Sequence, residues 1–191
     1  MKKEDIIALP NPHLHEKSSK VHVITDDVVK LVQDMTDASL DWEDSRPHEI
    51  SAALAAVQVD IMERVVIVRS DFDDKSARNF TALINPEIVK HEGEKIYDYE
   101  GCLSVSNIYG KVPRSSKIRV RAMDVDGNEV RFKAEGFLAR VIQHEIDHTN
   151  GVLFIDHIRD KTDAFYTLDE KGELQPLSYD EHIKNNRILW D

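Results

Sequence analysis

Residues 140–151 read R-V-I-Q-H-E-I-D-H-T-N-G and contain the pattern H-E-x-x-H. At 3.6 residues per turn, His144 and His148 lie about 40° apart on one face of a helix, where two imidazoles can share a cation. Glu145 points to the side, where it can take a proton from metal-bound water. Apolar neighbours indicate a buried helix, and buried imidazoles need polar partners. The stretch therefore predicts a metal site, against the alternative of a surface helix with two solvated histidines.

The segments around this helix have the patterns of strands. Residues 117–135 alternate apolar and charged side chains on both sides of Asp126-Gly127, as expected for a hairpin with one buried face. The helix itself is expected at residues 137–149, with Gly151 as its stop. Three further strands are expected upstream, at residues 65–69, at residues 80–85 ending at Pro86, and at residues 87–93.

An earlier helix is predicted at residues 28–40, where apolar side chains recur at helical intervals after an N-cap at Asp26 or Asp27. The polar segment that follows, with Pro47 as a breaker, is expected to end it. A helix, several antiparallel strands and a buried helix predict an α+β fold, with antiparallel or mixed sheets packed around the C-terminal H-E-x-x-H helix.

The composition favours one globular domain. The chain has 191 residues, 41% of them hydrophobic and 32% charged. We expect a single domain over residues 1–191, with a core of about 5–160 and a polar tail at 161–191 that carries a last helix near 179–189. The net charge of -11 argues against direct binding to nucleic acid or to anionic membranes. Neither a membrane span nor a signal or transit peptide is expected, so the predicted location is the cytoplasm.

A catalytic metal site of this kind needs a third protein ligand and leaves a position for water. Several carboxylates or histidines could serve, but Cys102, the single cysteine, stands out in the setting Y-E-G-C-L-S-V-S, where Gly101 frees the backbone before it. A thiolate with two imidazoles suits iron(II), zinc, cobalt or nickel. The alternative is a small buried hydrophobic residue, which is the commoner role of a lone cysteine.

Together these segments resemble the peptide deformylases, metal hydrolases that remove the formyl group from the N-terminal methionine of new proteins. The family carries the motifs G-x-G-x-A-A-x-Q, E-G-C-x-S and H-E-x-D-H. The second is intact at residues 100–104 and the third at 144–148. The first, at residues 51–58, keeps its alanines and glutamine, but Ser51 and Ala53 replace both glycines. The resemblance covers roughly residues 5–160.

The resemblance implies one divalent metal ion held by Cys102, His144 and His148. Iron(II) is expected, with zinc, nickel or cobalt as substitutes. Glu145 would act as the general base that activates the water and then passes the proton to the leaving amine. The side-chain amide of Gln58 and the backbone N–H of Leu103 would bind the oxyanion. Asp147 would lie beside the metal and pair with Arg114, or be a solvated helix carboxylate.

The resemblance also implies a set of substrate-contacting residues: Ser51, Ala53, Glu100, Gly101, Tyr109, Arg140 and Val141. Ser51 and Ala53 carry a Cβ that either narrows the peptide groove or is accommodated by a small shift. Tyr109 would sit at the groove's edge. Arg140 replaces an apolar residue of the methionine pocket. In one role it pairs with Asp147 or Glu100. In the other it shortens the pocket, or lets the pocket admit a polar or acidic side chain.

The leading hypothesis is a deformylase that acts on formylated peptides. The alternative is a divergent paralogue of low activity that binds metal and peptide or ribosome, although intact Glu145 and Gln58 speak against it. A zincin-type endopeptidase shares H-E-x-x-H, but a cysteine in E-G-C-L-S is not its ligand pattern. A formylated peptide is the expected partner, and a transient contact with the ribosome stays open.

Overall fold

The sheet of this protein is one antiparallel array that curves around a buried helix. The computed structural model describes residues 1–46, 49–72, 74 and 76–190. Within them the strand order is β1-β2-β3-β4-β6-β7, and β5 pairs with the far part of β4. The strands are β1 Ala53–Ala55, β2 Val65–Arg69, β3 Phe80–Cys102, β4 Val105–Met123, β5 Glu129–Glu135, β6 Phe165–Leu168 and β7 Leu174–Pro176. The predicted α+β class is confirmed.

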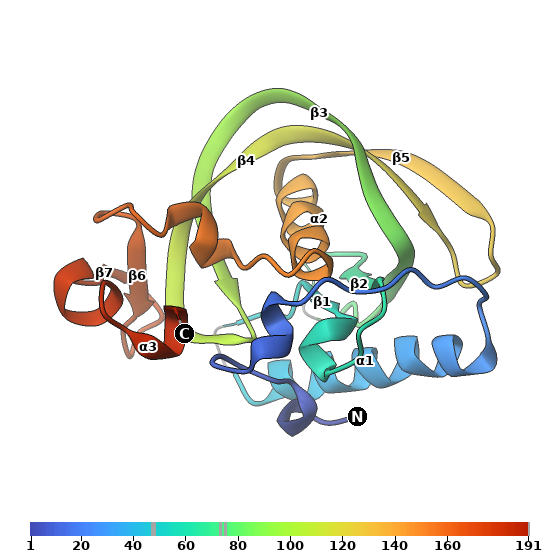
Figure 1. The fold of residues 1–191 in the computed structure, drawn as a ribbon, viewed down its shortest axis with the longest axis horizontal. Helices are drawn as coiled ribbons and strands as arrows, with labels where there is room; N and C mark the ends of the chain where they lie inside the picture. The colour runs from blue at the N-terminus through green and yellow to red at the C-terminus, as the bar shows by residue number, and fades with distance from the viewer. Residues whose placement is uncertain (47–48, 73, 75, 191) are drawn as a thin grey trace.

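Helix α2, Gly136–Thr149, is the predicted H-E-x-x-H helix and begins one residue earlier than expected. It lies between the arch of β3, β4 and β5 and the short strands β1 and β2 (Figure 1). Its apolar side chains, among them Ala139 and Ile142, form one core cluster with Val66 and Val120 from the sheet. Burial on several sides explains why this helix is apolar over much of its circumference.

Strand β3 is longer than predicted, because Pro86 does not end it. Residues 80–102 pair continuously with their neighbours, and the register against β4 shifts between Ile84 and Glu87. Asn85 takes a positive φ of 51° there, so the proline, which has no N–H to donate, is accommodated in a bulge. The prediction of separate strands at 80–85 and 87–93 is therefore wrong. Further register shifts bend the β3/β4 ribbon over α2. The predicted hairpin between β4 and β5 is confirmed.

Helix α1, Asp26–Asp44, also continues past its predicted end. Glu43, which the sequence places in a polar terminating segment, is completely buried and pairs with Arg69 of β2 at 2.6 Å between Oε2 and Nη1. This buried ion pair stabilises an additional helical turn that periodicity alone does not indicate. Pro47, the predicted breaker, lies outside the described residues.

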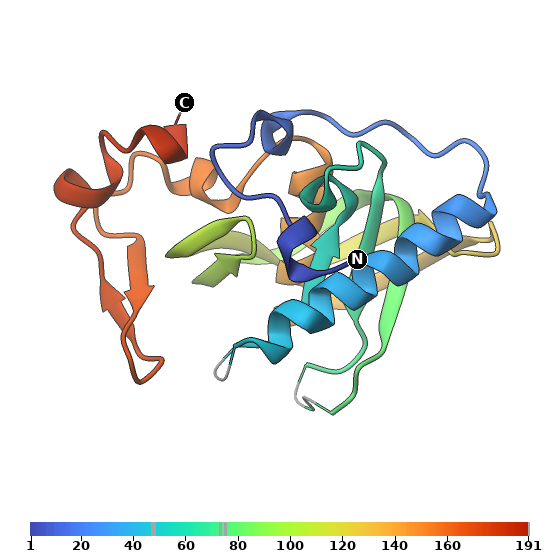
Figure 2. The ribbon, with the colours of Figure 1, turned by 90° about the horizontal axis from the view of Figure 1, so that it is seen from below.

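The C-terminal segment contains more regular structure than its polar composition suggests. Strands β6 and β7 form a hairpin beside β4, and Figure 2 shows this hairpin standing at one end of the molecule. The single helix expected near 179–189 is instead a π-helical turn, Tyr179–Ile183, followed by the short helix α3, Arg187–Trp190. Phe165, Ile183 and Leu189 anchor the segment in a second core cluster.

The remaining turns are 3-10 helices at Lys3–Asp5, Pro12–His15, Ala56–Val59 and Phe154–Ile158. None of the helices in the described ranges combines the length and the apolar character needed to cross a membrane.

Candidate metal centre and active site

Cys102 and the two histidines of α2 come together although His144 follows Cys102 by 42 positions in the chain. Cys102 is the last residue of β3, the strand that arches over α2 (Figure 1). The sulfur and one ring nitrogen of each histidine all lie within 4.8 Å of one another. The Cys102 Sγ is 3.2 Å from His148 Nε2. The sheet thus supplies the third candidate ligand to a pair that the helix positions by itself.

These three side chains fit a divalent cation. Tetrahedral bonds of about 2.0–2.3 Å place ligand atoms roughly 3.3–3.6 Å apart, so small adjustments bring the three onto one ion. Burial lowers the pKa of His148 well below its usual value, which keeps this imidazole in the neutral form that binds metal. Burial acts the same way on His144, but hydrogen bonds to Cys102 and Glu100 outweigh it and raise that pKa. A cation would take the place of the proton shared with the thiol.

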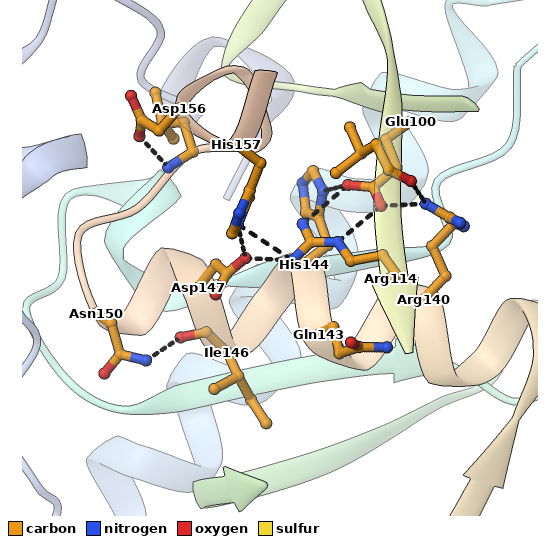
Figure 3. Close-up of polar contacts among 12 residues, drawn as sticks. Glu100, Arg114, Arg140, Gln143, His144, Ile146, Asp147, Asn150, Asp156 and His157 are labelled. Carbon is orange, nitrogen blue, oxygen red and sulfur yellow. Dashed lines mark hydrogen bonds and ion pairs between the residues drawn. The ribbon is translucent and has the colours of Figure 1, made fainter. Parts of the chain in front are cut away.

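Glu100 organises the charges behind His144 (Figure 3). It is 6% exposed, and its Oε2 lies 3.0 Å from His144 Nδ1, which leaves Nε2 of that ring for the metal. Arg114 donates to both carboxylate oxygens at 2.9 and 3.0 Å, and Arg140 donates to Oε1 at 2.7 Å. Although burial opposes it, the hydrogen bonds to His144 and Arg114 hold the pKa of Glu100 well below its usual range. Glu100 is therefore a carboxylate that orients a candidate metal ligand.

The predicted pair between Asp147 and Arg114 is confirmed: the guanidinium donates to the carboxylate. His157, which the sequence did not single out, joins the same carboxylate at 2.7 Å. A chain of ion pairs thus runs from Glu100 through Arg114 and Asp147 to His157, whose side chain is 34% exposed. It fastens the ligand helix to β4 and to the turn after α2. The sequence carries no signal for His157 beyond its closeness to the third motif.

Arg140 takes the structural role among those weighed from the sequence, and its carboxylate partner is Glu100 rather than Asp147. Its Nη1 also donates to the carbonyl of Val112 at 2.8 Å, and its Nη2 donates to that of Ile96 at 2.7 Å. The side chain is 5% exposed. Arg140 thus joins α2 to both long strands, and its guanidinium is held from several sides.

Gln58 and Glu145 flank the cluster. The side-chain oxygen Oε1 of Gln58 accepts a hydrogen bond from the Ala55 N–H at 2.9 Å. This bond directs the side-chain donor Nε2 toward Ser104 Oγ at 3.1 Å and Cys102 Sγ at 3.5 Å. Ser104, the last residue of the second motif, is a positioning partner that the sequence reasoning missed. The Glu145 Oε2 is buried and has no hydrogen-bond partner in the described ranges. Burial raises the pKa of Glu145 to about 7, although the positive charge of His144 acts to lower it.

A cavity of about 420 Å³ opens at the cluster and at Glu145. The predicted substrate residues that line it are Ala53, Glu100, Gly101, Tyr109, Arg140 and Val141, and the predicted oxyanion donors Gln58 and Leu103 line it as well. A Cβ on Gly101 would lie 2.6 Å from the ring of Tyr109, so this glycine is required by close packing. The Tyr109 hydroxyl donates to Glu49, and burial together with this bond raises the pKa of Tyr109.

Ser51 does not belong to this cavity, so the prediction that it shapes the peptide groove is wrong. Its side chain is completely buried and its hydroxyl lies 2.5 Å from that of Ser39. The Ser51 N–H donates to Glu43 Oε2 at 2.9 Å. Helix α1 supplies both partners, Ser39 from its predicted part and Glu43 from its additional turn, and they hold Ser51 in the interior. Of the two replaced glycines, only Ala53 faces the cavity.

The comparisons with known proteins agree with this geometry. Residues 3–164 match the family model described as polypeptide deformylase, so the match ends directly before β6. A peptide deformylase of Thermomicrobium roseum is 39% identical over 171 residues, which are 88% of this chain and 93% of that protein. One of Halothermothrix orenii is 42% identical over 148 residues, or 78% of this chain and 88% of that one.

Solved structures give the same result. A peptide deformylase of Synechococcus elongatus in complex with actinonin superposes with a TM-score of 0.74 at 31% identity, covering 82% of this chain and 80% of that one. The enzyme of Thermotoga maritima superposes with a TM-score of 0.70 at 32% identity, covering 80% and 95%. The fold, the intact second and third motifs and these relatives agree, and the chain belongs to the peptide deformylase family.

Proposed function

We propose that this chain removes the formyl group from the N-terminal methionine of formylated peptides, with Glu145 as the residue that carries the proton. The observation that supports this most directly is the position of Glu145. Its buried Oε2, which has no hydrogen-bond partner among the described residues, belongs to a side chain that lines one cavity with Cys102 and His144. Burial raises the pKa of Glu145 to about 7, which suits a group that accepts and releases a proton near neutrality.

Cys102, His144 and His148 would hold one divalent cation, which supplies Lewis acidity by lowering the pKa of water and polarising the formyl carbonyl. We expect iron(II) in the native protein and zinc, nickel or cobalt as substitutes, because a thiolate with two imidazoles suits each of them. Glu100 keeps His144 in the tautomer that presents Nε2 to the cation.

The chain's own residues perform the proton transfer and hold the charge. Glu145 takes a proton from the water that attacks the formyl carbon, and the oxyanion that forms accepts hydrogen bonds from Gln58 Nε2 and the backbone N–H of Leu103. Glu145 then delivers the proton to the amide nitrogen. The C–N bond breaks and the amine leaves, and the second proton of the water passes from the resulting formic acid to the amine or to solvent, so that formate is released.

The test is formate release from formyl-Met-Ala-Ser by protein loaded anaerobically with iron(II). We expect Glu145→Gln to lower kcat/KM by at least about 100-fold, the range of general acid–base contributions, with the metal content unchanged. Glu94→Gln, at an exposed carboxyl on β3 away from the cavity, serves as the matched control and should keep full activity. Formate release by the wild type that is no greater than release by Glu145→Gln would contradict the proposal. Cleavage of internal peptide bonds by the wild type would also contradict it.

A further inference from the structure

The β6–β7 hairpin lies at the cavity, although it follows the part of the chain that matches the family model. Its first strand pairs with β4 through Tyr109↔Tyr166 and Gly110↔Phe165. Phe165 is 1% exposed and fixes the base of the hairpin in the second core cluster. The ring of Tyr166 packs edge-to-face on Tyr99 of β3, with ring centroids 4.9 Å apart. The hairpin is therefore anchored next to the residue that was predicted to mark the groove's edge.

The tip of the hairpin is ordered by its own hydrogen bonds. The Asp169 carboxylate accepts from the backbone N–H groups of Lys171 and Glu173, each at 2.9 Å. The Asp169 N–H donates to the carbonyl of Glu173, also at 2.9 Å. These bonds close the turn and hold Leu168 directly opposite Leu174 in the register of the two strands. The pair of leucines is thus presented as one apolar surface.

This surface belongs to the same cavity as the catalytic cluster. Leu168, Gly172 and Leu174 of the hairpin line it together with Cys102 and Glu145. The wall contributed by the end of α1 and the segment after it includes Trp42 and Ile50. Both leucines are half-buried, so part of their apolar surface faces the cavity in the free protein.

We propose that the β6–β7 hairpin forms a subsite for the peptide downstream of the formylated methionine, and that Leu168 and Leu174 select an apolar side chain there. This rests on the function proposed above. An extended peptide whose formyl group lies at the cluster must continue along the cavity, and the leucines add apolar surface to its lining. Burying an apolar side chain against them contributes binding that a polar side chain does not.

The experiment measures kcat/KM for formyl-Met-Ala, as the reference, and for formyl-Met peptides of five residues. In these peptides leucine, serine or glutamate occupies position two, three or four in turn. In the wild type we expect leucine at one position to exceed serine by about fivefold. In Leu168→Ser/Leu174→Ser this ratio should fall to about one. Ile188→Ser, an exposed apolar residue of the same segment that does not line the cavity, is the matched control and should keep the ratio.

A second variant addresses the case in which the double substitution loosens the hairpin. Leu174→Lys should change the preference at the same position from leucine to glutamate, an outcome that mere unfolding of the hairpin does not produce. An unchanged leucine-to-serine ratio in the double variant, or an unchanged preference in Leu174→Lys, would overturn the subsite. If the wild type does not hydrolyse formyl-Met-Ala at all, the proposed function itself fails, so the two failures are distinguishable.

Discussion

At the scale of single residues, Arg140 shows how burial decides between two roles. A guanidinium one turn before a metal-binding histidine can reach either the substrate or the protein. A buried charge is retained only where partners compensate for its lost hydration, and here Glu100 and the carbonyls of Ile96 and Val112 do so. The same arginine holds the carboxylate that orients His144, so its effect on the centre passes through Glu100.

Replacing Arg140 with leucine should destabilise the protein strongly. The substitution leaves Glu100 with one arginine fewer and removes the donor to three strand carbonyls, those of Ile96, Asp98 and Val112. Removing one member of a buried pair costs about 3 kcal/mol or more. Urea unfolding at pH 7 measures the loss. Arg131→Leu, which removes an exposed pair with Glu129, is the matched control and should change the stability far less. Equal unfolding midpoints for the two variants would show that the Arg140 contacts contribute no stability.

At the scale of elements, helix α2 ends in a Schellman motif that the stop signal at Gly151 predicted. The N–H of Val152 donates to the carbonyl of Asp147, and that of Gly151 to the carbonyl of His148, each at 3.0 Å. Gly151 has a φ of 74°, a conformation that glycine adopts without strain. The motif ends the helix at Thr149, one residue after its last candidate ligand, and turns the chain against the N-terminal segment.

Gly151→Ala is therefore expected to lower the free energy of unfolding by more than the left-handed backbone alone explains. The cost of placing alanine in the left-handed backbone conformation is about 1 kcal/mol. Gly127→Ala, at a φ of 83°, measures this cost alone, because the nearest atom to a Cβ at residue 127 is Ile24 Cδ1 at 3.9 Å. At Gly151 the Cβ would lie 2.4 Å from the carbonyl oxygen of His15. Denaturant unfolding of both variants gives the comparison. If Gly151→Ala lowers the free energy of unfolding by less than Gly127→Ala does, the close approach to the His15 carbonyl does not restrict residue 151.

At the scale of the whole molecule, the candidate metal centre connects the end of β3 to the middle of α2. These elements already share a core, and Cys102, His144 and His148 converge where they meet. A bound cation would join sheet and helix, and a ligand that binds only the folded state stabilises it by mass action.

Removing the metal with a chelator should lower the melting temperature, and zinc should restore it. Zinc at 100 times its Kd contributes about 2.7 kcal/mol, which for a chain of this length corresponds to roughly 5–10 °C. His148→Gln should abolish most of this shift, whereas His182→Gln, at a histidine that is 55% exposed and outside the cluster, should retain it. A full shift in His148→Gln would place the bound zinc elsewhere.

The local pattern of residues was sufficient for helix α2, its stop at Gly151, the β4–β5 hairpin and two of the three candidate ligands. Helical spacing, strand alternation and capping act over a few neighbouring residues, so they can be read along the chain. The third ligand, Cys102, came from its setting and from the resemblance of the motifs, because no local rule connects residues so far apart.

The other features depend on contacts between distant segments. Arg69 extends α1 through Glu43, the bulge at Asn85 keeps β3 continuous past Pro86, and the partners supplied by α1 turn Ser51 out of the groove. The β6–β7 hairpin is held in place because Phe165 is buried in the core and β6 pairs with β4. A buried charge pair or a strand pairing gains its free energy only when both partners meet. The sequence by itself therefore determined the chemistry and the family, and the tertiary structure determined the shape of the cavity around them.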